Sequence, residues 1–244
     1  MPPSPARVVG RNPVTSFEAV DLVRPISRAV ALAAVVAAAV AAAGRARSLR
    51  GATPDEAEAS LPGDDLVPDP VYAATFATTI AAPAGAVWPW LVQMGQDRGG
   101  FYTFTFLERL GGVGVMNADR VVPEWQALEP GAQVLLAPGR PMTVALAAPP
   151  RTLVLHQALD ADGAVVAPDD PAAVTRWTWG FHLRGDAPGH ARLVVRMRWG
   201  GGGGARAAAQ GLLLWGPSAL LLTRGQLRGI RRRVEAAHAA GGVA

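Results

Sequence analysis

The 244-residue chain contains no cysteine, which excludes disulfide bonds, thiolate metal sites and cysteine nucleophiles. Histidine is also scarce: four residues lie far apart in the sequence, and none has the spacing of a metal-binding motif. The Gly-rich run MGQDRGG lacks the spacing of a phosphate-binding loop. We therefore expect neither a metal site nor a cofactor.

Lysine is absent as well, so all 23 basic residues are arginine. Together with the abundance of alanine, this usage is typical of a GC-rich genome, so the number of arginines says little about function. The net charge is only +4. The arginines gather in the N-terminal flank and near the C-terminus rather than alternating with aromatic residues, and we expect no nucleic-acid partner.

Long hydrophobic runs are limited to one segment, residues 26–44. It has no charge between Ala29 and Gly44, but it is mostly alanine and shorter than the roughly 20 apolar residues that a spanning helix needs. Three alternatives remain open: a single-pass membrane anchor, a secretory signal and a soluble Ala-rich helix. The anchor is preferred and predicts a membrane-associated protein; without it the protein would be cytoplasmic.

The rest of the chain divides by composition. Residues 1–25 are polar and Pro-rich, typical of a disordered tail. Residues 45–70 read as an acidic, Pro-rich linker, in which Thr53 and Glu56 form the capping box of a short helix. The folded domain is predicted for residues 71–238, with a short tail at 239–244.

The domain begins with a predicted strand at 71–82 and a helix that starts at Pro83. The apolar face of that helix is predicted to carry Val87, Trp88, Leu91 and Val92, with Trp90 and Met94 on another side. Pro89 should kink it. A second short helix is predicted over 101–112, because glycines follow it. Three short strands, QVLLAP, MTVALAAP and RTLVLHQAL, come next.

A hairpin over 174–199 is the clearest strand signal. Alternation places Trp177, Trp179 and Phe181 on one face of the first strand, opposite its basic residues. The second strand alternates in the same way, so the hairpin should have an aromatic inner face and a basic outer face. A long amphipathic helix beginning near Pro217 ends the chain. This order predicts an α+β fold with a curved antiparallel sheet wrapped around the C-terminal helix.

Four stretches also resemble a known family: GATPDEAEASLPGDDLVPDP, TIAAPAGAVWPWLVQMGQDRGGFYTF, NADRVVPEWQALEPG and LRGIRRRVE. They are similar to bacterial START-like (SRPBCC) proteins of unassigned function, a group related to polyketide cyclases and dehydrases. The resemblance implies a helix-grip fold with an apolar cavity. It implies no particular reaction, because one fold hosts many functions.

The predicted ligand-binding residues are mostly aromatic, as in other small-molecule pockets. They are Trp88, Trp90, Gln93, Tyr102, Trp177, Trp179 and Phe181. The alternative is that these side chains simply fill the core. Weak catalytic candidates are Arg98, Tyr102, Asp119 and Glu124, since a buried acid could transfer protons and the other two could stabilise an oxyanion. The competing interpretation is that they cap helices and form ion pairs. His156 is the histidine expected to face the cavity.

Three functions follow from these observations. The preferred one is binding of a hydrophobic small molecule, such as a lipid or polyketide-like compound, in the cavity of a membrane-tethered domain. The second is a cyclase or dehydratase acting on such a ligand, although an enzyme is the less favoured reading. The third is a non-catalytic module that binds a membrane surface or a partner through the basic last helix. The sequence does not specify the ligand or the oligomeric state.

Overall fold

The computed structural model describes residues 51–103, 117–201 and 216–241. Its elements are α2 (Pro54–Glu58), η1 (Asp64–Leu66), β1 (Tyr72–Ile80), α3 (Ala84–Val92), η2 (Pro123–Trp125), β2 (Gln133–Ala137), β3 (Arg140–Ala148), β4 (Thr152–Leu159), β5 (Val165–Val166), β6 (Thr175–Ala187), β7 (His190–Gly201) and α6 (Gly216–Gly241). The three strands predicted after residue 131 correspond to β2, β3 and β4.

Seven antiparallel strands form one sheet in the order β1-β7-β6-β4-β3-β2, with β5 beside β4. The predicted hairpin is confirmed as β6 and β7, in which Trp179 lies opposite Met197 and Phe181 opposite Val195. Because the side chains of a strand alternate between faces, this register gathers the aromatic residues of β6 and the apolar residues of β7 on one side of the sheet.

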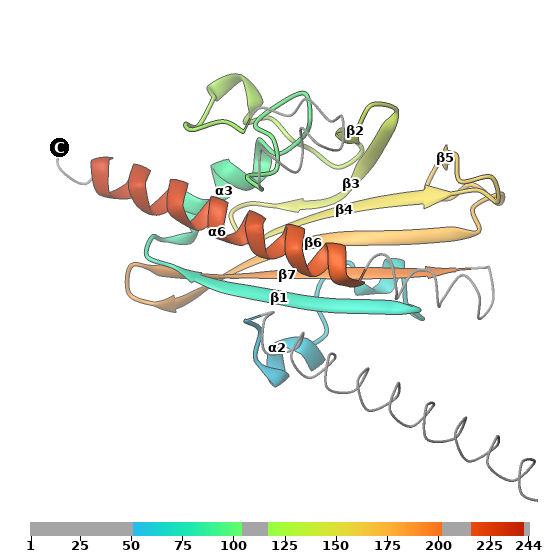
Figure 1. The fold of residues 1–244 in the computed structure, drawn as a ribbon, viewed down its shortest axis with the longest axis horizontal. Coiled ribbons are helices and arrows are strands. Elements are labelled where there is room, and N and C mark those ends of the chain that lie inside the picture. The colour runs from blue at the N-terminus through green and yellow to red at the C-terminus, as the bar shows by residue number, and fades with distance from the viewer. Residues whose placement is uncertain (1–50, 104–116, 202–215, 242–244) are drawn as a thin grey trace, which may run out of the picture. The chain divides into compact units, whose positions relative to one another are not determined.

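Helices α3 and α6 pack on that side, called here the inner face, and Figure 1 shows α6 lying across the sheet. The core combines Phe76 and Ile80 of β1, Phe181 of β6 and Ile230 of α6, all fully buried. The apolar stripe predicted for the last helix is thus its core-facing side. An antiparallel sheet with a long C-terminal helix packed on it is a helix-grip-like α+β arrangement, and this coarse fold prediction is confirmed.

The buried side of α3 differs from the prediction. Trp90 and Met94 are each 1% exposed, whereas Trp88, which was assigned to the apolar face, is only half buried. The helix contacts both the sheet and α6, so it buries side chains on more than one side. Almost every residue of α3 is apolar, and a helical period therefore carries little information about which of them face the core.

Residues 51–70, predicted to be an extended linker, instead pack on the opposite, outer face of the sheet. We call them the N-terminal strap. The predicted capping box is present: the Thr53 side chain accepts from the Glu56 amide, and the Glu56 carboxylate accepts from the Thr53 amide. The side chain of Glu56 is 4% exposed. A carboxylate is almost never buried to this extent unless it is paired, and its partners lie on the sheet.

Arginines of β6 and β7 hold the strap in place. Arg192 donates two hydrogen bonds to the Glu56 carboxylate, at 2.9 and 2.8 Å, and Arg184 also pairs with it. Arg196 donates to the carbonyls of Glu56, Ala57 and Ala59 at the end of α2, at 3.0 to 3.2 Å, and to the Asp64 carboxylate at 3.1 Å. The basic outer face predicted for the hairpin is therefore largely covered by an acidic segment of the same chain.

The predictions for residues 1–25 and 26–44 lie outside the described residues, as does most of the helix expected over 101–112. Within the described ranges, no helix combines the length and the apolar composition needed to cross a membrane.

Candidate functional site

The predicted binding residues fall into two groups. The first surrounds the end of α3, where the Tyr102 hydroxyl donates to the Trp90 carbonyl at 3.0 Å and accepts from Gln93 Nε2 at 2.9 Å. Gln93 Nε2 also donates to the Arg120 carbonyl, and Gln93 Oε1 accepts from the Val122 amide. Gln93 and Tyr102 are at most 1% exposed. Burial raises the pKa of Tyr102 to about 12, so its phenol stays protonated at neutral pH.

This network has a structural role, because its hydrogen bonds join α3 to the segment 117–126. Two further groups enclose the Tyr102 ring. The centroid of the Trp90 ring lies 5.8 Å from the centroid of the Tyr102 ring in an edge-on arrangement. The Arg233 guanidinium carbon lies over the Tyr102 ring, 5.2 Å from its centroid. Both hydrogen-bonding capacities of the Tyr102 hydroxyl are used within the chain. A ligand carbonyl can only accept a hydrogen bond, so it would have to displace the bond that the Tyr102 hydroxyl donates to the Trp90 carbonyl.

Of the other weak catalytic candidates, Arg98 lies near enough to Tyr102 for the two side chains to interact electrostatically. Asp119 and Glu124 are exposed to solvent. Arg98 donates to the Trp125 carbonyl, and burial lowers the pKa of its guanidinium. His156 also differs from expectation: its register partner is Thr178, on the outer face, rather than a residue of the aromatic row.

The second group is an aromatic row on the inner face of β6. The ring centroids of Trp177 and Trp179 lie 6.4 Å apart, those of Trp179 and Phe181 5.0 Å, and those of Phe101 and Trp179 6.0 Å. These separations are typical of aromatic pairs that attract one another. Phe181 is fully buried, Trp179 is 9% exposed, and Trp177 is only half buried. The row thus runs from the closed core toward a less covered end of the sheet.

The half-buried end of the row continues on β7 with Met197 and Trp199. We call Phe101, Trp177, Trp179, Met197 and Trp199 the aromatic inner patch. Helix α6 faces it, because the Thr223 hydroxyl lies 3.6 Å from the Met197 sulfur. Gln226 follows three residues later on the same side of α6, with its amide nitrogen 3.5 Å from the Met94 sulfur.

Two buried polar atoms in this region have no hydrogen-bond partner among the described residues: Trp179 Nε1 and Gln226 Oε1. The neighbouring Trp177 Nε1, by contrast, donates to Gln157 Oε1 at 2.8 Å. Buried polar groups without partners are rare in native proteins, because leaving one unpaired costs about 1–3 kcal/mol. The inner patch therefore combines apolar surface with an unmatched donor and an unmatched acceptor, as a site for a largely apolar ligand would.

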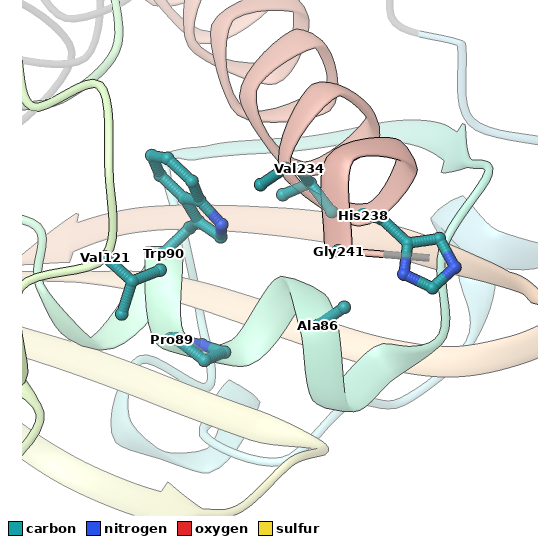
Figure 2. A pocket seen from close by; sticks show the side chains of 8 residues that line it. Ala86, Pro89, Trp90, Val121, Val234, His238 and Gly241 are labelled. Carbon is teal, nitrogen blue, oxygen red and sulfur yellow. The ribbon is translucent and has the colours of Figure 1, made fainter. Parts of the chain in front are cut away.

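A groove of about 400 Å³ lies elsewhere, between α3 and the end of α6 (Figure 2). Its lining is almost entirely apolar. The residues are Ala86, Pro89, Trp90, Val121, Val234, Ala237, His238 and Gly241. Of the predicted binding residues only Trp90 lines it, and this side chain is 1% exposed. Trp88, the remaining predicted residue, is half buried on α3 and does not line the groove.

Six residues at or beside the aromatic inner patch were missing from the predicted binding residues: the apolar Phe101, Met197 and Trp199, and the polar Gln157, Thr223 and Gln226. Gln157 follows His156 in the otherwise apolar strand β4, whereas Gln226 lies in α6 in a stretch that also contains Thr223, Arg224 and Arg228. A polar residue on a predicted core-facing side is a usable signal, but the position of Gln226 on α6 is known only once the start of that helix is fixed.

The sheet, the C-terminal helix and the aromatic inner patch define a helix-grip-like α+β domain. Several solved structures are similar to it at low sequence identity. Protein MLL2253 from Mesorhizobium loti is 16% identical, with 68% of this chain and 98% of that chain covered and a TM-score of 0.35.

Two further solved structures show similarity at a comparable level. Protein NE0264 from Nitrosomonas europaea is 12% identical, with 70% of this chain and 99% of that chain covered and a TM-score of 0.42. Ara h 8.0201 is 11% identical, with 68% of this chain and 98% of that chain covered and a TM-score of 0.36. No protein-family model matches the sequence, and no curated protein matches it significantly. Similarity at this level concerns the fold and says nothing about a ligand or a reaction.

Proposed function

We propose that the domain binds a hydrophobic small molecule against the aromatic inner patch, between β6 and β7 and the first half of α6. The observation that carries this proposal is the Trp179 indole: it is 91% buried among aromatic rings, yet its N–H has no partner in the described part of the chain. A ligand with one hydrogen-bond acceptor on an apolar body would satisfy that donor while covering the half-buried rings.

The gradient of burial along the row supports the same location. At the Phe181 end, α3 and α6 close the inner face completely, whereas Trp177, Met197 and Trp199 keep exposed surface. Large aromatic side chains supply most of the contact area in small-molecule sites, and a few polar groups fix the orientation. Removing this surface from water contributes about 25 cal/mol per Å² to binding.

The first experiment is native mass spectrometry of the purified full chain, followed by organic extraction. We expect an apolar compound that is retained under native conditions and released on denaturation. Titration with the dye 1-anilinonaphthalene-8-sulfonate then gives a binding curve that the extracted compound competes away. A protein that carries no compound and shows no saturable dye binding would refute the proposal.

Matched variants locate the site. Trp179→Phe keeps an aromatic ring but removes the unpartnered N–H, and it should weaken binding of the extracted compound several-fold. Trp125→Phe makes the same change on η2, which is not part of the aromatic inner patch, and should leave binding unchanged. Equal weakening by both variants, or by neither, would place the ligand elsewhere, with the groove between α3 and α6 as the next position to test.

A further inference from the structure

The N-terminal strap is attached to the domain differently from α3 and α6. Among the described residues, the hydrophobic core is built from β1 onward, and no residue of the strap belongs to it. Ion pairs and hydrogen bonds from Arg192, Arg196 and Arg198 hold the strap on the outer face instead. Within residues 51–70, Val67 is the one buried apolar side chain. A segment with so few apolar contacts can leave the sheet while the core stays intact.

The turn at Gly63 and Asp64 covers one row of the outer face. That row crosses three strands and consists of Val154 on β4, Gly180 on β6 and Arg196 on β7. A Cβ atom built at Gly63 would lie 2.7 Å from a methyl carbon of Val154. At the other end of the row, the Asp64 carboxylate accepts from Arg196 at 3.1 Å. Since η1 also contacts β6, the strap spans the whole row.

The His182 imidazole occupies the space beside Gly180 in this row. A Cβ atom built at Gly180 would lie 2.7 Å from His182 Nε2. His182 is 7% exposed, and neither ring nitrogen has a hydrogen-bond partner in the described part of the chain. A neutral imidazole loses little in such a place, whereas an imidazolium would bury a charge and two N–H donors that have no acceptor. The covered row therefore disfavours the protonated ring.

The charged groups on the elements around His182 do not reverse this preference. They are Asp64 of η1, Glu56 of α2, Arg184 of β6, and Arg192 and Arg196 of β7, and β4 contributes the uncharged Thr152 and Val154. Glu56 is engaged by Arg184 and Arg192. Burial is the largest effect on the ring and lowers the pKa of His182 to about 4; Asp64 favours protonation, and Arg196 opposes it.

We propose that the strap is an acid-released cover of the basic outer face: protonation of His182 favours a state in which residues 51–70 leave the sheet while the sheet and its helices stay folded. In the released state the imidazole meets water, so its charge no longer has to be buried. Release also uncovers the guanidinium groups on β7 that the strap pairs, at Arg192, Arg196 and Arg198. The domain would present this basic face at mildly acidic pH and keep it covered at neutral pH.

The size of the effect follows from proton linkage. The exposed ring takes up its proton near its ordinary pKa of 6.5, whereas the ring beneath the strap does so near pH 4. The ratio of released to docked strap should therefore rise about 30-fold between pH 7.5 and pH 5. Glu56 acts at lower pH, because its hydrogen bonds from Arg192 hold its pKa at about 2.

Thiol labelling measures release in the full chain, which has no native cysteine. Val154→Cys places a thiol beneath Gly63, at a position that is 1% exposed. Ala161→Cys places one at an exposed position in the β4–β5 connection. The rate of reaction with 4,4′-dithiodipyridine at position 154, divided by the rate at position 161, reports the released fraction and cancels the pH dependence of the thiol itself. We expect this ratio to rise about 30-fold from pH 7.5 to pH 5.

Further variants separate release from unfolding and identify the proton. A thiol introduced by Val195→Cys, in the fully buried inner core, should react much more slowly than the thiol at position 154, because only unfolding exposes it. His182→Gln and His182→Leu should each remove most of the pH dependence at position 154, whatever they do to the rate at pH 7.5. His190→Gln, at an exposed position, should retain it. No rise at position 154, a rise that survives both His182 variants, or equal rates at positions 154 and 195 would overturn the proposal.

Discussion

The Tyr102 hydroxyl is a single atom that joins two parts of the fold. It donates to the Trp90 carbonyl in α3 and accepts from Gln93, whose amide reaches the segment after residue 117. At 1% exposure, none of these groups can turn to bulk water if the hydroxyl is removed. The residue also has φ +60°, an uncommon value for a side chain other than glycine, so its neighbours must hold it in place.

Replacing Tyr102 by phenylalanine tests this role. Tyr102→Phe keeps the ring and its edge-on contact with Trp90 but leaves the Trp90 carbonyl without this hydroxyl donor and Gln93 Nε2 without one of its two acceptors. We expect a loss of about 1–3 kcal/mol in the free energy of unfolding, measured by urea denaturation followed by tryptophan fluorescence. A variant as stable as the parent protein would show that the hydroxyl is dispensable and could be available to a ligand.

At the scale of elements, the strap explains why the arginines of β7 need not imply a polyanionic partner. Arg192, Arg196 and Arg198 all bond to residues 51–70, and the strap supplies both carboxylates and the carbonyl end of α2. The interaction is local charge matching: an acidic segment folds onto a basic strand of its own chain. Burial of these guanidinium groups without such partners would cost several kcal/mol.

Glu56→Gln separates the charge of the strap from its shape. Glutamine has nearly the same size but leaves the Arg192 guanidinium, whose side chain is 15% exposed, without its carboxylate. We expect the free energy of unfolding to fall by about 3 kcal/mol, and proteolysis within residues 51–70 to become faster. The control Glu58→Gln, at an exposed position two residues away, should change stability by less than about 0.5 kcal/mol. Similar losses in both variants would argue against the buried ion pair.

The packing of α6 depends on a glycine. A Cβ atom built at Gly229 would lie 1.9 Å from the Tyr102 carbonyl oxygen, closer than any real contact. Gly229→Ala should therefore push α6 away from residue 102 and destabilise the fold by about 2 kcal/mol or more. Gly85→Ala in the first turn of α3 has open space around the new methyl group and should raise stability by up to about 1 kcal/mol. Thermal denaturation of the two variants would give opposite shifts in Tm.

Particular residues show what the sequence could and could not predict at this scale. Strict alternation placed the aromatic and basic faces of β6 and β7 correctly, because a strand with a period of two leaves little ambiguity. The buried side of α3 was assigned wrongly for Trp88 and Trp90, because nearly every residue there is apolar. The strap looked like a linker, because its proline, glycine and aspartate content is that of a loop. Its docking depends on an ion pair between Glu56 and Arg192, 136 residues apart.

At the scale of the whole molecule, the sheet separates two environments. The inner face is apolar and aromatic and is covered by α3 and α6, whereas the outer face is polar and is covered by the strap (Figure 1). Of the aromatic inner patch, only Trp177 and Trp179 were among the ligand-binding residues predicted from the sequence. The sequence also did not reveal that Trp90, Gln93 and Tyr102 form a hydrogen-bonded network separate from this patch. That division depends on how α3 and α6 meet the sheet, which no local pattern encodes.

The outer face also makes the stability of the whole domain sensitive to acid. His182 lies there at 7% exposure, and neither ring nitrogen has a hydrogen-bond partner in the described part of the chain. Burial lowers the pKa of His182 to about 4. Hydrogen bonds from Arg192 outweigh burial and lower the pKa of Glu56 to about 2. In both cases the unfolded chain binds a proton at a higher pH than the folded chain does.

For both groups, the contribution to the free energy of unfolding therefore decreases as the pH is lowered. The His182 contribution is complete above about pH 6.5 and is lost as the pH falls toward 4; that of Glu56 is complete above about pH 4.5 and is lost toward pH 2. Each one-proton difference gives a slope of about 1.4 kcal/mol per pH unit. Urea denaturation at several pH values should show a decline from pH 6.5 downward. Burial also lowers the pKa of His156, so His182→Leu should reduce the slope between pH 6.5 and 4 without removing it, whereas His190→Gln, at an exposed position, should leave it unchanged. A slope as steep in His182→Leu as in the parent protein would show that His182 does not take up the proton on unfolding.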